Sequence, residues 1–175
     1  MSNKEALREL QVRLAQRLQA VREQPREAGW LAVECAGVGL LLPLAQAGEI
    51  HAERVLTQVP HAAEWMVGVA NLRGHLHTVV DLAGFLRLRE QVPAPAAAAQ
   101  LVVLNTTLHV NCALRVDRLL GLRDPSMLER RPDDPAVQRP AFAGVVWLDK
   151  AGRRWQELSL AAMAEDPRFL DVAAA

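Results

Sequence analysis

Cysteine and long apolar runs are both scarce in this chain of 175 residues. The two cysteines, Cys35 and Cys112, stand far apart in apolar runs, so we expect free, buried thiols in a reducing compartment. No apolar run reaches the ~20 residues that are needed to cross a bilayer, and no signal segment opens the chain. These absences predict a cytoplasmic location without membrane insertion.

An excess of charge is also lacking, because 20 Lys and Arg balance 20 Asp and Glu. Non-specific nucleic-acid binding depends on surplus positive charge, so we do not expect it. Lysine is confined to Lys4 and Lys150, and the basic residues are otherwise Arg. Arg favours bidentate pairing at interfaces, although a GC-rich genome would give the same bias. Hydrophobic residues make up 51% of the chain, which indicates a folded domain with a real core.

Motifs that carry catalysis are missing. The sequence has no Gly-x-Ser-x-Gly elbow, no glycine-rich phosphate loop and no Cys-x-x-Cys pair. His75 and His77 would share one face of a strand, but zinc needs three or four ligands. We therefore predict no enzyme, no metal and no cofactor. The alternative is a small-ligand-binding or hydrolytic β-barrel protein with His75 and His77 in a polar pocket.

Residues 1–28 have the pattern of an amphipathic N-terminal helix. Ser2 and Glu5 fit a capping box, and Pro25 marks the end. One stripe at helical spacing holds Leu7, Leu10, Leu14, Leu18 and Val21. This stripe either packs on the following domain or binds a partner, and the sequence leaves both open.

From Trp30 onward the pattern is one of short strands. We expect strands over 30–35, 38–43, 45–50, 101–105, 109–116, 117–122, 143–148 and 154–158, and a hairpin over 67–82. Residues 61–66 could form one helical turn, 89–100 a Pro/Ala-rich linker and 130–140 a loop. Ser159 is a candidate cap for a short C-terminal helix over 160–164. Many short strands with few helices indicate barrels or a sandwich, and a weak internal echo suggests two halves.

The segment from Glu64 to Leu88 carries the most specific pattern. It contains Gly-Val-Ala-Asn-Leu-Arg-Gly, then Val-Val-Asp-Leu, with Arg73 at the tip of a turn that Gly74 allows to be tight. This wording resembles the signature of CheW-like domains, the adaptor modules of bacterial chemosensory arrays. Within the family it is most similar to the adaptors of type IV pilus twitching-motility systems. The resemblance covers about residues 29–165, and residues 166–175 are a C-terminal tail. The closing segment 165–172 also resembles the tail of those pilus adaptors.

The resemblance implies a mainly β fold of two SH3-like five-stranded β-barrel subdomains. It also implies a non-catalytic scaffold that couples methyl-accepting chemoreceptors to the regulatory domain of a CheA-type histidine kinase. Self-association in arrays occurs in the family and stays open for this chain. Asp81 follows a strand of the signature and is structural there. Thr78 stands where many relatives have Pro, so we expect a more regularly paired hairpin here.

The resemblance also assigns candidate partner-binding residues. Arg73 could bind a receptor carboxylate or pair internally with Glu49, and both roles could hold. Glu49 and Ile50 match residues beside the kinase-binding surface. The walls of the receptor groove would include Leu72, Val79, Val80, Val116 and Leu119, although each of these residues, taken singly, is more typical of the core than of an interface.

Overall fold

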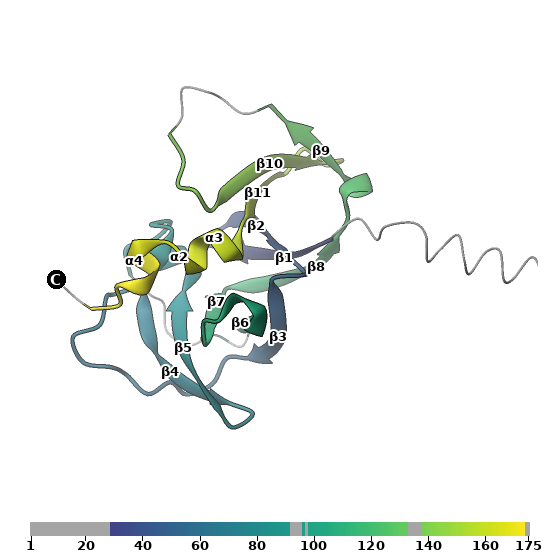
Figure 1. Cartoon of the computed structure of the whole chain (residues 1–175). Helices are drawn as coiled ribbons and strands as arrows, with labels where there is room; N and C mark the ends of the chain where they lie inside the picture. The colour runs from purple at the N-terminus through teal and green to yellow at the C-terminus, as the bar shows by residue number, and fades with distance from the viewer. Residues whose placement is uncertain (1–28, 92–95, 97, 133–137, 174–175) are drawn as a thin grey trace, which may run out of the picture.

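The computed structural model describes residues 29–91, 96, 98–132 and 138–173, and it is a mainly β protein with two antiparallel-rich sheets (Figure 1). The N-terminal helix predicted over 1–28 lies outside these residues. The six-stranded sheet has the order β8 (Arg118–Arg123), β1 (Trp30–Cys35), β2 (Val38–Pro43), β11 (Arg154–Leu158), β10 (Ala143–Asp149) and β9 (Leu128–Arg131). The five-stranded sheet has the order β3 (Ala47–Ala52), β6 (Gln100–Leu104), β7 (Cys112–Val116), β5 (His75–Asp81) and β4 (Met66–Leu72).

Short helical segments complete the described elements. They are α2 (Leu82–Phe85), α3 (Leu160–Ala164) and α4 (Pro167–Leu170), with single 3-10 turns η1 (Thr106–Leu108) and η2 (Pro125–Met127). The predicted cap of α3 is confirmed, because the Ser159 hydroxyl accepts from the backbone N–H of Ala162. Asp81 caps α2 in the same way through Gly84.

The prediction of five strands per subdomain is wrong for one of the two sheets. Residues 128–131 form β9, which pairs antiparallel with β10, whereas we expected a loop from residue 130. Leu128 packs against the cluster of Trp30 and Trp155, so the segment is drawn onto the sheet before the prolines begin. Residues 61–66 form turns rather than a helical turn, and β4 begins at Met66.

The two sheets are not two consecutive halves of the chain. The first hairpin, β1–β2, lies in the same sheet as the last three strands, because β2 pairs in parallel with β11. Strands β3 to β7 form the other sheet between them in sequence. The internal echo therefore does not correspond to the way that the sheets are assembled.

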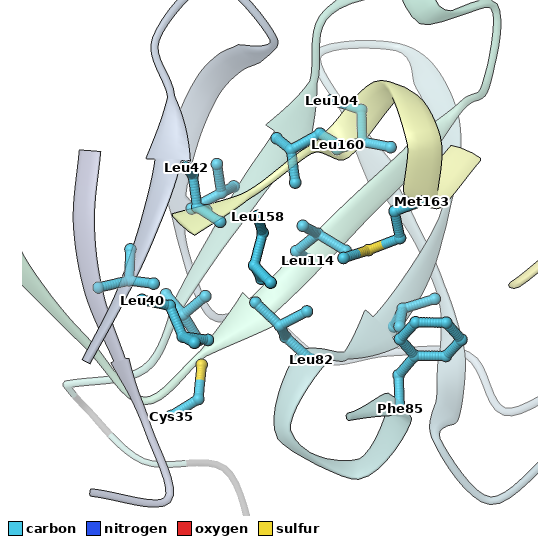
Figure 2. Close-up of a cluster of buried hydrophobic side chains, with 14 of the residues drawn as sticks. Cys35, Leu40, Leu42, Leu82, Phe85, Leu104, Leu114, Leu158, Leu160 and Met163 are labelled. Carbon is cyan, nitrogen blue, oxygen red and sulfur yellow. The ribbon is translucent and has the colours of Figure 1, made fainter. Parts of the chain in front are cut away.

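One buried cluster joins both sheets to the helices. Its side chains come mainly from β1 and β2, from β5 to β7, from β11 and from α2 to α4, and Figure 2 shows a group of them pointing toward one another. Labelled members of this cluster are Cys35, Leu40, Leu42, Leu82, Phe85, Leu104, Leu114, Leu158, Leu160 and Met163. Each fully buried leucine contributes roughly 1.5–3 kcal/mol, so this shared core fixes the two sheets relative to one another. Cys35 and Cys112 are both free and buried, as predicted.

Residues beyond the predicted boundary at 165 also pack on this core. Phe169 of α4 is buried and stacks on Trp65 with ring centroids 6.3 Å apart. Phe85 meets both rings edge-on, at centroid distances of 5.2 Å. Trp65 is half-buried, and its ring packs against the main core through these two phenylalanines.

Candidate partner-binding site

The tip of the β4–β5 hairpin presents Arg73 to solvent. Leu72 is paired with His75, so the loop consists of Arg73 and Gly74 alone. Both residues have positive φ, 51° and 88°, as a tight two-residue hairpin turn requires. The side chain of Asn71 accepts from the Gly74 N–H at 2.8 Å and closes the turn. Gly adopts this conformation freely, whereas Arg does so at a cost of roughly 1 kcal/mol.

Arg73 forms an ion pair with Glu49, which lies on the edge strand β3 of the five-stranded sheet. Its Nη1 donates to Glu49 Oε1 at 2.8 Å, and the other carboxylate oxygen lies 3.2 Å from His51 Nε2. Strands β3 and β4 are the two edges of this sheet, so the pair links the edge strand β3 to the turn that follows the other edge. The side chains are 74% and 53% exposed, and such exposed pairs contribute only ~0–1 kcal/mol to stability.

Two large apolar side chains are exposed on the same strands. Ile50 follows Glu49 on β3, and Leu76 lies next to the turn on β5. An apolar side chain beside an exposed charged pair is the composition of many protein interfaces, where an apolar centre has a polar rim. Arg73, Glu49 and Ile50 are therefore all accessible, as the resemblance requires.

Four of the five predicted walls of the receptor groove are buried. Leu72 and Val79 are buried in a small cluster of the five-stranded sheet, and Val116 is in the main core together with Val80. These four side chains are at most 3% exposed, which argues against direct contact with a partner, and their role in receptor binding stays a prediction. Leu119 is half-buried and packs against the main core.

The histidine pair lies at a cavity. His75, His77 and His51 line a space of about 410 Å³ together with Glu49 and Arg73. His77 Nδ1 is 3.0 Å from the backbone oxygen of His75, so this ring has a local partner. Among the described residues, no group of three or more His, Cys, Asp or Glu side chains is arranged to hold a metal ion. The arrangement offers no set of ligands that would turn the pair into a metal centre.

A buried charge network lies behind the hairpin, and sequence reasoning missed most of it. Asp81, predicted to be structural, is fully buried, and Arg89 donates to it through Nε at 3.0 Å. Arg89 also donates to Asp117 at 2.9 Å, and Asp117 accepts from the backbone of Ala36 in the β1–β2 turn at 2.7 Å. The network therefore connects the end of the signature strand β5 to the first hairpin of the other sheet.

Arg115 of β7 extends this network on the other side of Asp81. It is buried and donates to Asp81 at 3.2 Å and to Glu53 at 3.3 Å. Burial opposes the charge of Arg115, but the Glu53 and Asp81 carboxylates outweigh it and raise the pKa of the guanidinium. Each charge in the chain of residues thus has an opposite neighbour, which is the condition for burying charges at all.

Thr78, at the place of the family's usual proline, bonds through its backbone to the segment before β7. Whether it also makes the β4–β5 hairpin more regular stays a prediction, and the register of that hairpin shifts between Met66 and Gly68. The backbone N–H of Thr78 donates to the Asn111 oxygen at 3.0 Å, where β5 begins to pair in parallel with β7. Proline has no N–H and could not form this bond. Gly68, earlier in the hairpin, has φ of 142°, and a Cβ there would lie 2.6 Å from the Thr57 oxygen. The hairpin therefore contacts the segment around Thr57 through β4 and the segment around Asn111 through β5.

Comparisons with known proteins agree with this architecture. A family model described as the CheW-like domain matches residues 29–168. The chain is 30% identical to Protein PilI of Pseudomonas aeruginosa over 164 residues. This match covers 92% of this chain and 89% of Protein PilI. The fold is similar to the crystal structure of the scaffolding protein TtCheW from Thermoanaerobacter tengcongensis, with a TM-score of 0.64 and 18% identity over 79% of this chain and 88% of that one.

Two further findings bear on the kind of protein. In the part of the chain that the structure describes, no helix is long and apolar enough to span a membrane. CheW-like scaffolding proteins are non-catalytic, and CheW-like domains in general bind CheA and chemoreceptors. With a family model matched over most of its length, the chain belongs to the CheW-like domain family, the scaffold adaptors of chemosensory signalling.

Proposed function

We propose that this chain is the cytoplasmic adaptor of a pilus-linked chemosensory system. It holds the regulatory domain of a CheA-type histidine kinase at the signalling tips of methyl-accepting receptors, so that a receptor change shifts the kinase between states. The support for a pilus system is the 30% identity to Protein PilI over most of both chains. The hairpin wording and the closing segment of the sequence point the same way.

The observation that carries the proposal is the exposed position of Arg73 at the tip of the signature hairpin. Its ion pair with Glu49 is exposed and contributes little stability. An exposed charged pair with an exposed apolar side chain, Ile50, close by has the composition of a partner-binding surface. Because Arg73 is paired with Glu49, we infer that Arg73 lies with Glu49 and Ile50 on the kinase-binding surface, as its central cation, rather than facing the receptor. Leu119 stays a candidate for the receptor-binding surface.

The first test measures binding of the purified chain to the kinase regulatory domain and to the receptor signalling tip of the same organism. We expect Arg73→Ala and Glu49→Ala each to weaken kinase binding about tenfold, because each removes a charged hydrogen-bonding group from the interface. Arg168→Ala is the matched control, since Arg168 is also a partly exposed Arg beside a carboxylate, at 3.6 Å from Asp166. Binding of neither partner by the unchanged chain would refute the proposal.

A charge swap separates the two roles of Arg73. The double variant Arg73→Glu with Glu49→Arg restores an internal ion pair and reverses both charges toward a partner. If Arg73 contacts the kinase, the double variant binds the kinase as weakly as the single variants do, although circular dichroism shows an intact fold. Recovery of binding in the swap would show that Arg73 acts only by fixing the hairpin to β3.

The pilus assignment has its own test in cells. Removal of the gene should abolish pilus-driven surface spreading and leave flagellar swimming in liquid unchanged. The intact gene should restore spreading, and the Arg73→Ala gene should not. A loss of directed swimming with normal surface spreading would instead assign the adaptor to flagellar chemotaxis.

A further inference from the structure

A second surface of the molecule has the properties of a binding groove and shares no residue with the Arg73 surface. It encloses about 700 Å³ between the β1–β2 turn, the segment after α2, and strands β10 and β11. Its floor is made of buried apolar side chains: Leu40, Phe142, Val146, Trp155 and Leu158. Val38 and Leu88 stand on its rim and are 38% and 37% exposed. An apolar floor with large exposed apolar side chains on the rim is typical of an interaction site.

The charge of the groove has one sign. Its lining, taken over the described residues, includes Arg139, Arg153 and Arg154 and no Asp or Glu. Arg153 is held in place, because it donates to Glu34 at 2.7 Å and lies 4.6 Å over the Trp155 ring. Arg154 is exposed and makes no ion pair or side-chain hydrogen bond within the described residues. A carboxylate from outside the domain is the natural complement of such a rim.

The backbone of the groove excludes addition of a strand. Strand β2 is paired on both sides, with β1 and β11, and β11 is paired with β2 and β10. These strands therefore have no free edge, and a partner can be recognised only through its side chains. An amphipathic helix that lays apolar side chains into a groove is the recognition mode that fits this condition.

We propose that this groove is a docking site for an amphipathic helix of a partner protein, with aliphatic side chains against the exposed Val38 and Leu88 and with Asp or Glu side chains facing Arg154 and Arg153. It would be a third binding surface, separate from those that bind the kinase and the receptor. The inference goes beyond the proposed adaptor function, because it adds a partner and does not depend on where the kinase binds.

The test uses the full chain and three synthetic helical peptides. The probe carries leucines along one stripe and glutamates elsewhere. One comparison peptide replaces each Glu by Lys, and the other has the probe's composition in scrambled order without a stripe. Isothermal titration calorimetry should show binding of the Glu peptide, weakened by added salt, and binding at least about tenfold weaker for both comparison peptides.

Variants of the chain locate the binding. Val38→Glu and Arg154→Glu should each weaken binding of the Glu peptide about tenfold or more. Val55→Glu and Arg54→Glu are the matched controls, because they make the same changes at exposed positions outside the groove, and they should bind as the unchanged chain does. Thermal unfolding of each variant checks the fold, since Val38 and Arg154 are exposed enough to be replaced without loss of the core.

Three results would overturn the proposal. They are no binding of the Glu peptide, equal binding of the Glu and Lys peptides, and equal effects of the groove and control variants. The kinase and receptor assays are run on the same variants. Normal binding of both partners by Val38→Glu supports a separate third surface, whereas its loss would place the groove within the adaptor surfaces and contradict a third site.

Discussion

At the scale of single residues, Arg73 is the position where folding and the proposed kinase contact make opposite demands. Its φ of 51° suits Asn or Gly better than Arg. We expect Arg73→Asn to raise the free energy of unfolding slightly, by roughly 1 kcal/mol or less, because relief of the strained backbone outweighs loss of an exposed ion pair. Urea denaturation measures the change.

The other two-residue turn offers a control for that prediction. Ala36 has φ of 50° before Gly37, and Cys35 pairs with Val38 across it. Ala36→Asn should therefore give a gain similar to that of Arg73→Asn, since it removes the same backbone strain without touching a charge. A clear loss of stability in Arg73→Asn alone would mean that the Glu49 pair matters to the fold more than its exposure suggests.

The two thiols give a prediction from pKa. Burial raises the pKa of Cys35 and of Cys112 to about 12 each. Only the thiolate reacts with alkylating reagents, so at pH 8 a fraction of about one in 10⁴ is reactive, and the burial limits access further. We expect no iodoacetamide labelling of the folded chain at that pH and two labels per chain in guanidinium, counted by mass spectrometry. Rapid labelling of either cysteine in the folded state would show that the core opens locally.

At the scale of elements, the features that the sequence predicted are those decided by nearby residues. Three such local patterns are a two-residue turn with Gly, an alternating apolar run, and a Ser three residues before the N–H that it caps. The hairpins and the helix α3 that they predicted are confirmed. Strand β9 was missed because its stability comes from β10 and from a tryptophan cluster distant in sequence. Likewise no local pattern could place β2 beside β11.

Thr78 supplies the prediction at this scale. Thr78→Pro should destabilise the domain by about 3 kcal/mol, because it removes the N–H that bonds Asn111 and places a proline ring in a strand that is paired on both sides. Thr78→Val is the control, since it keeps the N–H and a β-branched side chain. The readout is the midpoint of urea unfolding, and equal midpoints for the two variants would show that the parallel pairing of β5 with β7 is dispensable.

At the scale of the whole molecule, the buried charge network ties the sheets together. Asp81 has Arg89 on one side and Arg115 on the other, so its removal leaves two buried guanidinium groups without their shared carboxylate. We expect Asp81→Asn to lower the free energy of unfolding by about 3–5 kcal/mol. Glu165→Gln, which neutralises an exposed carboxylate, should change it by no more than ~0.5 kcal/mol.

Guanidinium denaturation at neutral pH checks this pair of variants, and an effect of Asp81→Asn as small as that of Glu165→Gln would contradict the role given to the network. The sequence could identify Asp81, since it follows an apolar strand in a specific motif. It could not identify Arg89, Arg115 or Glu53, because their partners lie on other strands and isolated Arg and Glu residues usually face solvent. The same limit applies to Val79 and Val116, whose burial depends on which sheet face is covered.

The parallel pairing of β2 with β11 also sets an order of events at the ribosome. The β1–β2 hairpin is synthesised first, but the strand that covers its free edge ends at Leu158. At about 5–20 residues per second, translation of the intervening chain takes on the order of ten seconds. During that time the edge of β2 and its leucines, Leu40 to Leu42, are without their final neighbours. A nascent chain with an uncovered apolar strand edge is prone to pair with the wrong strand, so we expect this domain to depend on chaperones during synthesis more than a fold of sequential hairpins would.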